Sequence, residues 1–127
     1  MNVQILHTGY FKLDGGAMFG VVPRTMWSTH NPPDQNNLCT WALRCLLVQD
    51  GDRVIVIDCG MGRKQDDRFR NRYGVSDEVD IAQAVQNAGV SPAAVTDVIL
   101  THLHFDHCGG AIAFDTQKEA YRTVFPN

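Results

Sequence analysis

One stretch carries most of the chemistry in this sequence, and it reads Thr101-His102-Leu103-His104-Phe105-Asp106-His107-Cys108-Gly109-Gly110. Three of the five histidines of the chain lie in it. Residues two apart on an extended backbone point to the same side, so His102 and His104 can converge on one ion. A tight turn after them would bring Asp106 and His107 to an adjacent position. Gly109 and Gly110 would supply backbone freedom for that turn and allow a following element to approach closely.

The residue types in this stretch are those of a metal site. Imidazole and carboxylate groups suit zinc, iron and manganese in sites with open positions. The apolar run Val98-Ile99-Leu100 just before them predicts a short buried strand. The ligands would then stand on a loop at the carboxyl end of a strand, where α/β sheets place their sites. We therefore predict that His102, His104, Asp106 and His107 bind metal.

A second apolar strand is predicted upstream, at Arg53–Ile57. It forms a hairpin with Trp41–Val48, because both segments favour strands and Asp50-Gly51 between them is a strong turn signal. Val54 to Ile57 is apolar at every position, which predicts a strand buried on both faces. That strand runs into a glycine-bearing loop, Asp58-Cys59-Gly60-Met61-Gly62.

The remaining segments complete a single α/β domain over residues 1–127. We expect strands at Val3–Leu6, Tyr10–Leu13 and Ala17–Val22, a helix at Glu78–Ala88 and a helical turn at Ser91-Pro92. Ser76 or Asp77 can cap the start of the helix, and Gly89 can end it. The segment from Pro23 to Asn37 is rich in Pro, Asn, Thr and Ser and predicts a long loop, a kind that is usually functional.

Composition and charge argue against several classes of protein. The chain is 44% hydrophobic and 20% charged with a formal net charge of -3, so neither disorder nor a nucleic-acid partner is expected. One basic segment, interrupted by Asp66 and Asp67, predicts a solvated surface; its members are Arg63, Lys64, Arg68, Arg70 and Arg72. No apolar run long enough for a membrane and no secretory signal are visible, which predicts a cytoplasmic protein. The thiols Cys39, Cys45, Cys59 and Cys108 lack metal-binding spacing and are expected to be reduced.

The pattern His102-x-His104-x-Asp106-His107 after a short apolar strand resembles the hallmark of the metallo-β-lactamase superfamily. The resemblance implies an αββα sandwich, with a mixed sheet and helices on its outer face, of which this chain is the amino-terminal half. It also implies two divalent metal ions, with zinc favoured and iron or manganese as alternatives. His102 and His104 would bind the first ion, and Asp106 and His107 the second.

The same resemblance implies a mechanism. A hydroxide that bridges the two ions, held and oriented by Asp106 as the catalytic residue, would attack the substrate, because a bound cation lowers the pKa of water from about 15.7 to near 7. Ile57-Asp58-Cys59-Gly60 is similar to the Asp-x-Gly of the family at the end of an earlier strand. Asp58 would then steady a metal ligand by hydrogen bonding and not bind metal itself. A cap on a turn is the alternative role for Asp58.

The sequence departs from the family pattern after the motif. The family takes further metal ligands from downstream segments, yet no histidine follows His107 here, and the only later aspartate, Asp115, is too close to the motif. The chain is therefore predicted to be incomplete at its carboxyl end and to need the missing half of the fold as its partner. Alone it would be unstable or self-associated and catalytically inactive, an inactive metal-binding fragment being the non-enzymatic alternative. A homodimer is left open.

Within the superfamily, the motif looks like that of the quorum-quenching lactonases. This implies hydrolysis of an ester or lactone, with an acyl-homoserine-lactone-like substrate favoured. Met18, Phe19, Trp27 and Phe105 are candidates for an apolar wall around an acyl chain, with packing of the sheet as the alternative role. Phosphotriester or phosphoester hydrolysis is the runner-up. His104 argues against a redox di-iron protein, whose motif has glutamate there, and a mononuclear iron thiol dioxygenase stays open.

Overall fold

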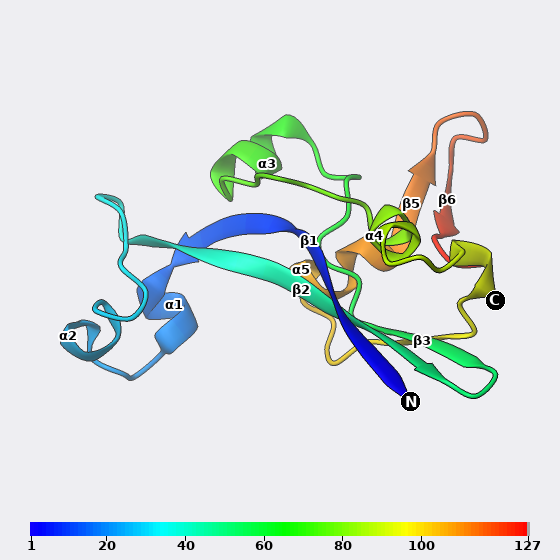
Figure 1. The fold of residues 1–127 in the computed structure, drawn as a ribbon. Coiled ribbons are helices and arrows are strands. Elements are labelled where there is room, and N and C mark those ends of the chain that lie inside the picture. The colour runs from blue at the N-terminus through cyan, green and yellow to red at the C-terminus, as the bar shows by residue number, and fades with distance from the viewer. Residues whose placement is uncertain (127) are drawn as a thin grey trace.

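The computed structural model describes residues 1–126, and its main element is a four-stranded sheet in the order β1-β2-β3-β4 (Figure 1). β1 and β2 are antiparallel, as are β2 and β3, whereas β3 and β4 are parallel, so the sheet is mixed. The elements, in chain order, are β1 (Asn2–Asp14), α1 (Gly15–Phe19), α2 (Arg24–Trp27), β2 (Leu38–Asp50), β3 (Arg53–Ile57), α3 (Asp67–Arg72), α4 (Ile81–Asn87), η1 (Pro92–Ala94), β4 (Asp97–Ile99), α5 (Phe105–Cys108), η2 (Gly109–Ala111), β5 (Ile112–Asp115) and β6 (Ala120–Thr123). β5 and β6 form a separate antiparallel hairpin.

The β1–β2 hairpin is longer than the sequence predicts. The expected strands at Val3–Leu6 and Tyr10–Leu13 are parts of one strand of 13 residues, with a register shift between His7 and Gly9. Gly9 has a φ of 127°, and a Cβ on it would lie 2.8 Å from the carbonyl oxygen of Ser76. Glycine is required at this position because the chain around Ser76 crosses the strand there.

The prediction of a strand at Ala17–Val22 is wrong, because the chain forms the short helix α1 there. The Asp14 carboxylate accepts a hydrogen bond from the Ala17 amide at 3.0 Å, which caps this helix and turns the chain away from the sheet. A second short helix, α2, lies inside the predicted loop at Pro23–Asn37. The two helices form an arm, residues 15–37, that projects from the end of the β1–β2 hairpin (Figure 1).

The predicted helix at Glu78–Ala88 is present as the shorter α4. Asp80 is the residue before its first turn, so neither Ser76 nor Asp77 caps it as predicted. Gly89 follows its end with a φ of 84°, the left-handed conformation in which glycine commonly ends a helix. The helical turn predicted at Ser91-Pro92 is η1, with proline in its first position. Within residues 1–126, no helix combines the length and the apolar character needed to cross a membrane.

One face of the sheet packs against α4 and forms the larger of two cores. Its buried members are Leu6, Cys45, Leu47, Val56, Cys59, Ile81, Ala84, Val85, Val95 and Phe125. A smaller core of Phe11, Leu43 and Met61 lies beneath α3. Both cores contact the loop after β3, through Cys59 and Met61, so this loop is anchored from two sides.

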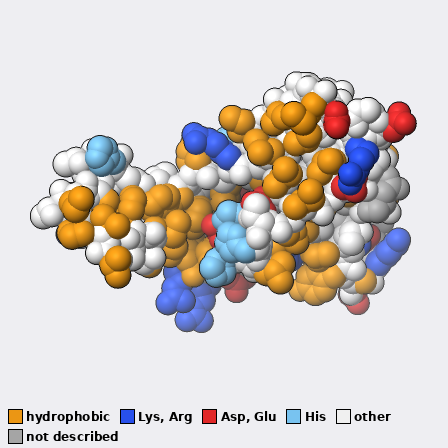
Figure 2. Space-filling view, turned by 90° about the horizontal axis from the view of Figure 1, so that it is seen from below, with side chains coloured by type: hydrophobic (Ala, Val, Ile, Leu, Met, Phe, Trp, Pro, Cys, Tyr) orange, Lys and Arg blue, Asp and Glu red, His pale blue; other side chains and the backbone are white. Residues whose placement is uncertain are grey.

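The opposite face of the sheet is apolar and open. Cross-strand partners lie on the same face, so the strand register defines two apolar rows across it. The first row is Ile5, Leu46, Ile57 and Ile99, and the second is Val3, Val48 and Ile55. We call these two rows the open face. Figure 2 views the molecule from the side opposite α3 and α4 and shows apolar side chains spread over it.

The open face explains why the predicted burial of the inner strands is only partly realised. Val56, on the face toward α4, is fully buried, whereas Ile99 on the open face is 48% exposed. Val98 is the partner of Val56 on the edge strand β4 and is 38% exposed, so β4 is not the buried strand that the sequence predicts. Soluble monomers rarely leave an apolar patch of more than a few hundred Å² uncovered. Within residues 1–126, one face of this sheet therefore still lacks the layer that its side chains require.

We predict that the polypeptide of residues 1–127, produced alone, self-associates through the open face. Its mass in solution should exceed that of a monomer, and replacing Ile5 and Ile99 with lysine should reduce the association by placing charge at both ends of the first row. Val21→Lys is the matched control, because Val21 is fully exposed but lies on the arm. Sedimentation velocity is the measurement, and a stable monomer at all concentrations would contradict the prediction.

Candidate metal centre

The candidate site lies at the edge of the sheet where β3 and β4 end. These strands are parallel, so their carboxyl ends meet, and the loops that follow them are joined by backbone hydrogen bonds. The Asp58 amide donates to the Ile99 carbonyl at 2.9 Å, and the Cys59 amide donates to the His107 carbonyl at 2.7 Å. The histidine motif is thereby held against the loop after β3.

The three imidazoles of the motif lie close together. The ring centroids of His102 and His104 are 4.7 Å apart, and those of His102 and His107 are 4.0 Å apart. The tight turn expected after His104 is the helix α5, a single turn that carries Asp106 and His107. Asp106 Oδ2 lies 3.3 Å from His107 Nε2, so these two residues are adjacent in space.

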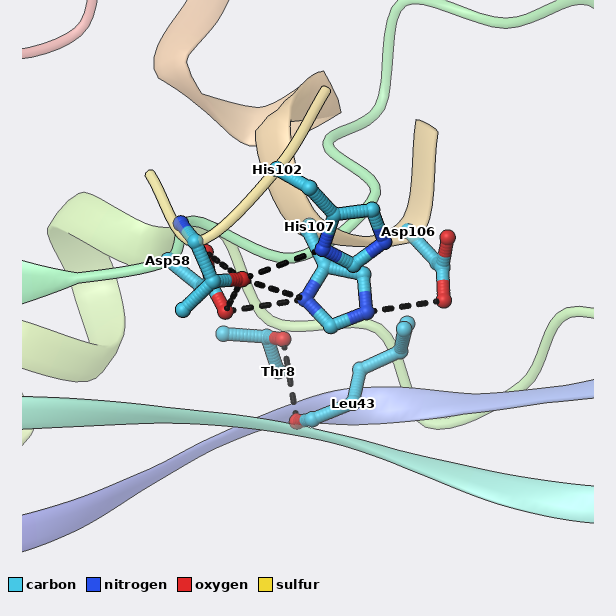
Figure 3. Close-up of polar contacts among 7 residues, drawn as sticks. Thr8, Leu43, Asp58, His102, Asp106 and His107 are labelled. Carbon is cyan, nitrogen blue, oxygen red and sulfur yellow. Dashed lines mark hydrogen bonds and ion pairs between the residues drawn. The ribbon is translucent and has the colours of Figure 1, made fainter. Parts of the chain in front are cut away.

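Asp58 accepts the hydrogen bonds that connect this site (Figure 3). Its carboxylate accepts from the Thr101 amide at 2.9 Å, from the Thr101 hydroxyl at 2.8 Å and from His107 Nδ1 at 2.8 Å. Asp58 has a φ of 59°, a conformation that aspartate tolerates better than most residues. Burial alone would raise the pKa of the Asp58 carboxyl, but hydrogen bonds from His107 and Thr101 outweigh it and hold this pKa below its usual value.

Thr101 is a residue that the motif does not single out. Its hydroxyl lies 3.2 Å from His102 Nδ1 and 3.4 Å from His107 Nδ1, in addition to its bond with Asp58. It therefore links both imidazoles to the same carboxylate. The sequence signal for this role is weak, since it consists only of a hydroxyl residue directly before the first histidine.

One pair of side chains, Asp106 and His107, has donor atoms at the spacing that a single ion requires. Ligand atoms about 2.1 Å from one tetrahedral ion lie about 3.4 Å apart, which agrees with the 3.3 Å between Asp106 Oδ2 and His107 Nε2. His102 and His104 are the other predicted pair, and both are exposed to solvent. Within residues 1–126, no three side chains are arranged to hold one ion. Each pair therefore leaves positions open for further ligands.

Gly109 and Gly110 are required for a reason that differs from the predicted one. They belong to η2 and do not have the positive φ values that would call for backbone freedom. A Cβ on Gly110 would overlap the Cys59 carbonyl oxygen, and a Cβ on Gly109 would overlap that of Met61. Glycine is needed because an earlier loop, and not a following element, lies directly against them.

Phe105, one of the predicted substrate contacts, lies beside the site. It follows His104 directly and packs in an aromatic cluster with Phe11, Phe69 and Tyr73. The ring centroids of Phe105 and Tyr73 are 4.9 Å apart, and those of Phe105 and Phe69 are 5.3 Å apart. Helix α3 therefore adds aromatic side chains to the surroundings of the site that the sequence does not identify.

Met18, Phe19 and Trp27, the other predicted substrate contacts, belong to the projecting arm. Phe19 and Trp27 stack with ring centroids 4.8 Å apart, and Trp27 is only 4% exposed. A Cβ on Gly15 would overlap the Trp27 ring, so this ring fills the space between α1 and α2. Packing of the arm is the role that these contacts show for Trp27, and its contact with a substrate stays a prediction.

The basic segment is less solvated than predicted. Arg70 forms a bidentate ion pair with Glu78, whose side chain is only 10% exposed. Lys64 Nζ donates hydrogen bonds to the carbonyl oxygens of Gly109 and Ile112. The prediction of a solvated surface is therefore wrong for Arg70, because Glu78 holds its side chain against the protein. Lys64 is exposed, as predicted, although two carbonyl groups hold its ammonium group.

The fold and the sequence comparison together identify the class of protein. The sequence model of the Metallo-beta-lactamase superfamily matches residues 44–122, which is more than half of the chain. The chain therefore belongs to the metallo-β-lactamase superfamily. The predicted fold class, the amino-terminal part of its α/β fold, is confirmed by this match and by the structural relatives.

The individual relatives include hydrolases of known structure. The chain is 29% identical over 97 residues to the N-acyl homoserine lactonase of Bacillus cereus, covering 68% of this chain and 38% of that protein. It is similar to a probable metal-dependent hydrolase from Staphylococcus aureus, with a TM-score of 0.80 and 32% identity over 87% of this chain and 40% of that chain. It is also similar to the dizinc quorum-quenching lactonase AidC, with a TM-score of 0.66 and 27% identity over 98% of this chain and 39% of AidC. The chain thus spans about two fifths of the length of these relatives.

The contact of Gly110 with the loop after β3 leads to a stability prediction for the protein encoded by the complete open reading frame. Gly110→Ala should lower the free energy of unfolding by about 3 kcal/mol, because backbone atoms must move to admit the methyl group. Gly51→Ala is the control, since its φ of 57° costs about 1 kcal/mol but its Cβ would meet nothing within 4 Å. Urea unfolding measures both, and equal losses would contradict the close approach.

The thiols beneath the site should be unreactive. Burial raises the pKa of Cys45 to about 11 and that of Cys59 to about 12. Only the thiolate is nucleophilic, so at pH 8 iodoacetamide should modify these two thiols about 100-fold more slowly in the folded protein than in urea. Their reactivity should increase as the pH approaches 11. Peptide mapping by mass spectrometry distinguishes the cysteines, and rapid labelling of Cys59 at pH 8 would contradict its burial.

Proposed function

We propose that this chain provides the metal-binding half of a binuclear metallo-hydrolase that opens ester or lactone bonds. The observation that carries the proposal is the clustering of His102, His104, Asp106 and His107 in the segment after β4. We assign His102 and His104 to one ion and Asp106 and His107 to the other. Two ions bound there would lower the pKa of bound water to near 7 and polarise the bond under attack. Zinc is favoured by this donor set, with iron or manganese as alternatives. The remaining ligands would come from a downstream half.

Asp58 and Thr101 would act by fixing the imidazoles. His107 Nδ1 faces the Asp58 carboxylate, which favours the tautomer with its proton on Nδ1 and leaves Nε2 as the donor for metal. The Thr101 hydroxyl faces His102 Nδ1 in the same way. The low pKa of Asp58 supports this role, because the carboxylate stays ionised and keeps accepting these hydrogen bonds at neutral pH.

Asp106 is proposed as the catalytic residue. It lies in the first turn of α5, one residue before His107, and its Oδ2 faces His107 Nε2. A carboxylate has two oxygens, so one can bind metal while the other accepts a hydrogen bond from the attacking water and orients it. Replacing Asp106 with asparagine would keep its size but remove the charge that this role requires.

A lactone with an apolar acyl chain is the favoured substrate. The similarity to the lactonase of Bacillus cereus and to AidC, whose structure holds an N-acyl homoserine product, supports this class. The aromatic cluster around Phe105 offers an apolar surface next to His104 on which such a chain could pack.

The test uses the protein encoded by the complete open reading frame. We expect about two equivalents of zinc by elemental analysis and hydrolysis of acyl homoserine lactones. His104→Ala and Asp106→Ala should abolish turnover, whereas Asp58→Ala, which leaves all donors in place, should lower metal affinity or activity by only about 10–100-fold. Arg44→Ala is a matched control, because Arg44 is exposed on β2 and has no part in the site.

The substrate panel decides between hydrolase types. It should include lactones of short and long acyl chain, a phosphotriester and a β-lactam. Preference for the phosphotriester would assign the protein to the runner-up class, phosphoester hydrolysis. Full activity of His104→Ala, or a protein that binds no metal, would contradict the proposed function itself.

A further inference from the structure

Lys64 joins the two ends of the segment that follows the metal-ligand motif. Its Nζ donates to the carbonyl oxygen of Gly109, the residue that ends α5, and lies 3.2 Å from the carbonyl oxygen of Ile112, where β5 begins. One ammonium group therefore bonds to both ends of the turn η2. This turn follows directly after the helix that carries Asp106 and His107.

Two backbone hydrogen bonds hold the turn in addition to those from Lys64. Gly109 and Gly110 have no side chains to pack, and the last carbonyl groups of a helix lack partners inside it. The Gly110 amide donates to the Gly60 carbonyl at 2.9 Å, which fixes one point of the turn. The Ala111 carbonyl accepts from the Val124 amide at 2.9 Å, which fixes a second point. Lys64 holds the carbonyl groups of Gly109 and Ile112, and a cation at the end of a helix is favourable for the carbonyl groups there.

Lys64 also differs in its surroundings from the basic residues near it. Its bonds go to backbone carbonyl groups, and within residues 1–126 it takes part in no ion pair. Lys64 is exposed as a residue, but desolvation of its ammonium group lowers the pKa of that group. Arg63, its neighbour, instead pairs with Asp80 at 3.8 Å, and both of those side chains are more than half exposed.

We infer that Lys64 is a positioning residue for the second metal pair, Asp106 and His107, and acts through the carbonyl groups of Gly109 and Ile112. The inference rests on the proposed function, because it assumes that this pair binds metal. Losing the two hydrogen bonds would let the end of α5 move away from the loop after β3. The separation of the Asp106 and His107 donors would then vary, and the ion they share would be held less tightly.

The direction in which metal affinity changes when Lys64 is replaced distinguishes a positioning role from a purely electrostatic one. Lys64 is a cation near a proposed site for cations, so Coulomb repulsion alone predicts that removing its charge strengthens metal binding. Positioning predicts the opposite, that metal binding weakens. Removing the charge of Arg63 provides the same electrostatic change without loss of a carbonyl contact.

The experiment compares Lys64→Met, Lys64→Arg and the control Arg63→Met in the protein encoded by the complete open reading frame. Titration of the metal-free proteins with Co²⁺, followed by absorption spectroscopy, reports the two equivalents separately. We expect Lys64→Met to bind the second equivalent about tenfold more weakly, with a smaller change in the first. Arg63→Met should match the parent or bind slightly tighter. Lys64→Arg, which keeps donors for both carbonyl groups, should recover most of the affinity.

Hydrogen exchange of the metal-free proteins provides a readout that does not depend on metal. The Gly110 amide should exchange faster in Lys64→Met than in the parent or in Arg63→Met. If Lys64→Met does not fold, Lys64→Gln takes its place with the same expectation. Unchanged or tighter binding of the second equivalent in these variants would overturn the role of Lys64. A parent protein that binds no Co²⁺ would instead overturn the proposed function.

Discussion

The hydrogen bonds accepted by Asp58 are the interaction on which the site depends. One buried carboxylate receives the amide and hydroxyl of Thr101 from the strand end of β4 and the imidazole of His107 from α5. A buried charge without such partners would be costly, so these groups are held where the carboxylate needs them. Because Asp58 itself ends β3, the positions of the imidazoles are set by the parallel pairing of β3 with β4.

The contact behind the site is made by backbone alone. The loop after β3 lies against Gly109 and Gly110 so closely that no side chain fits between them, and Lys64 closes the turn from outside. The helix α5 is therefore fixed from two directions, by Asp58 below His107 and by the glycine contact after it. These two contacts keep α5 in place, as is required of a site whose donor atoms must stay at fixed distances to hold an ion.

The open face of the sheet and the exposed histidines lie on the same side of the molecule (Figure 2). A single further layer could cover the apolar rows and supply ligands to the open positions of both donor pairs. The two relatives of known structure are more than twice as long as this chain, which leaves ample length for such a layer in them. Burial of the rows and completion of the metal centre would then be one event, and stability and activity would be lost together.

The sequence by itself determined the features that depend on near neighbours in the chain. The alternation of side chains along an extended backbone placed His102 beside His104, and Asp50-Gly51 marked the turn between β2 and β3. The sequence also showed directly that no histidine follows His107. Its failures were local too. The strand expected at Ala17–Val22 is a helix because the hydrogen bond from the Ala17 amide to the Asp14 carboxylate outweighs a weak β preference.

Only the tertiary structure decided the roles that depend on residues distant in sequence. Composition suggested that Lys64 was a solvated cation, yet carbonyl groups 45 and 48 residues away hold it. Trp27 was predicted to contact a substrate or to pack the protein, and the structure shows that it packs in the arm. Glycine is required at 109 and 110, as predicted, but the reason is the close contact of both residues with the loop after β3. Such contacts leave no periodic signal, because they arise where separate segments meet and not along either one.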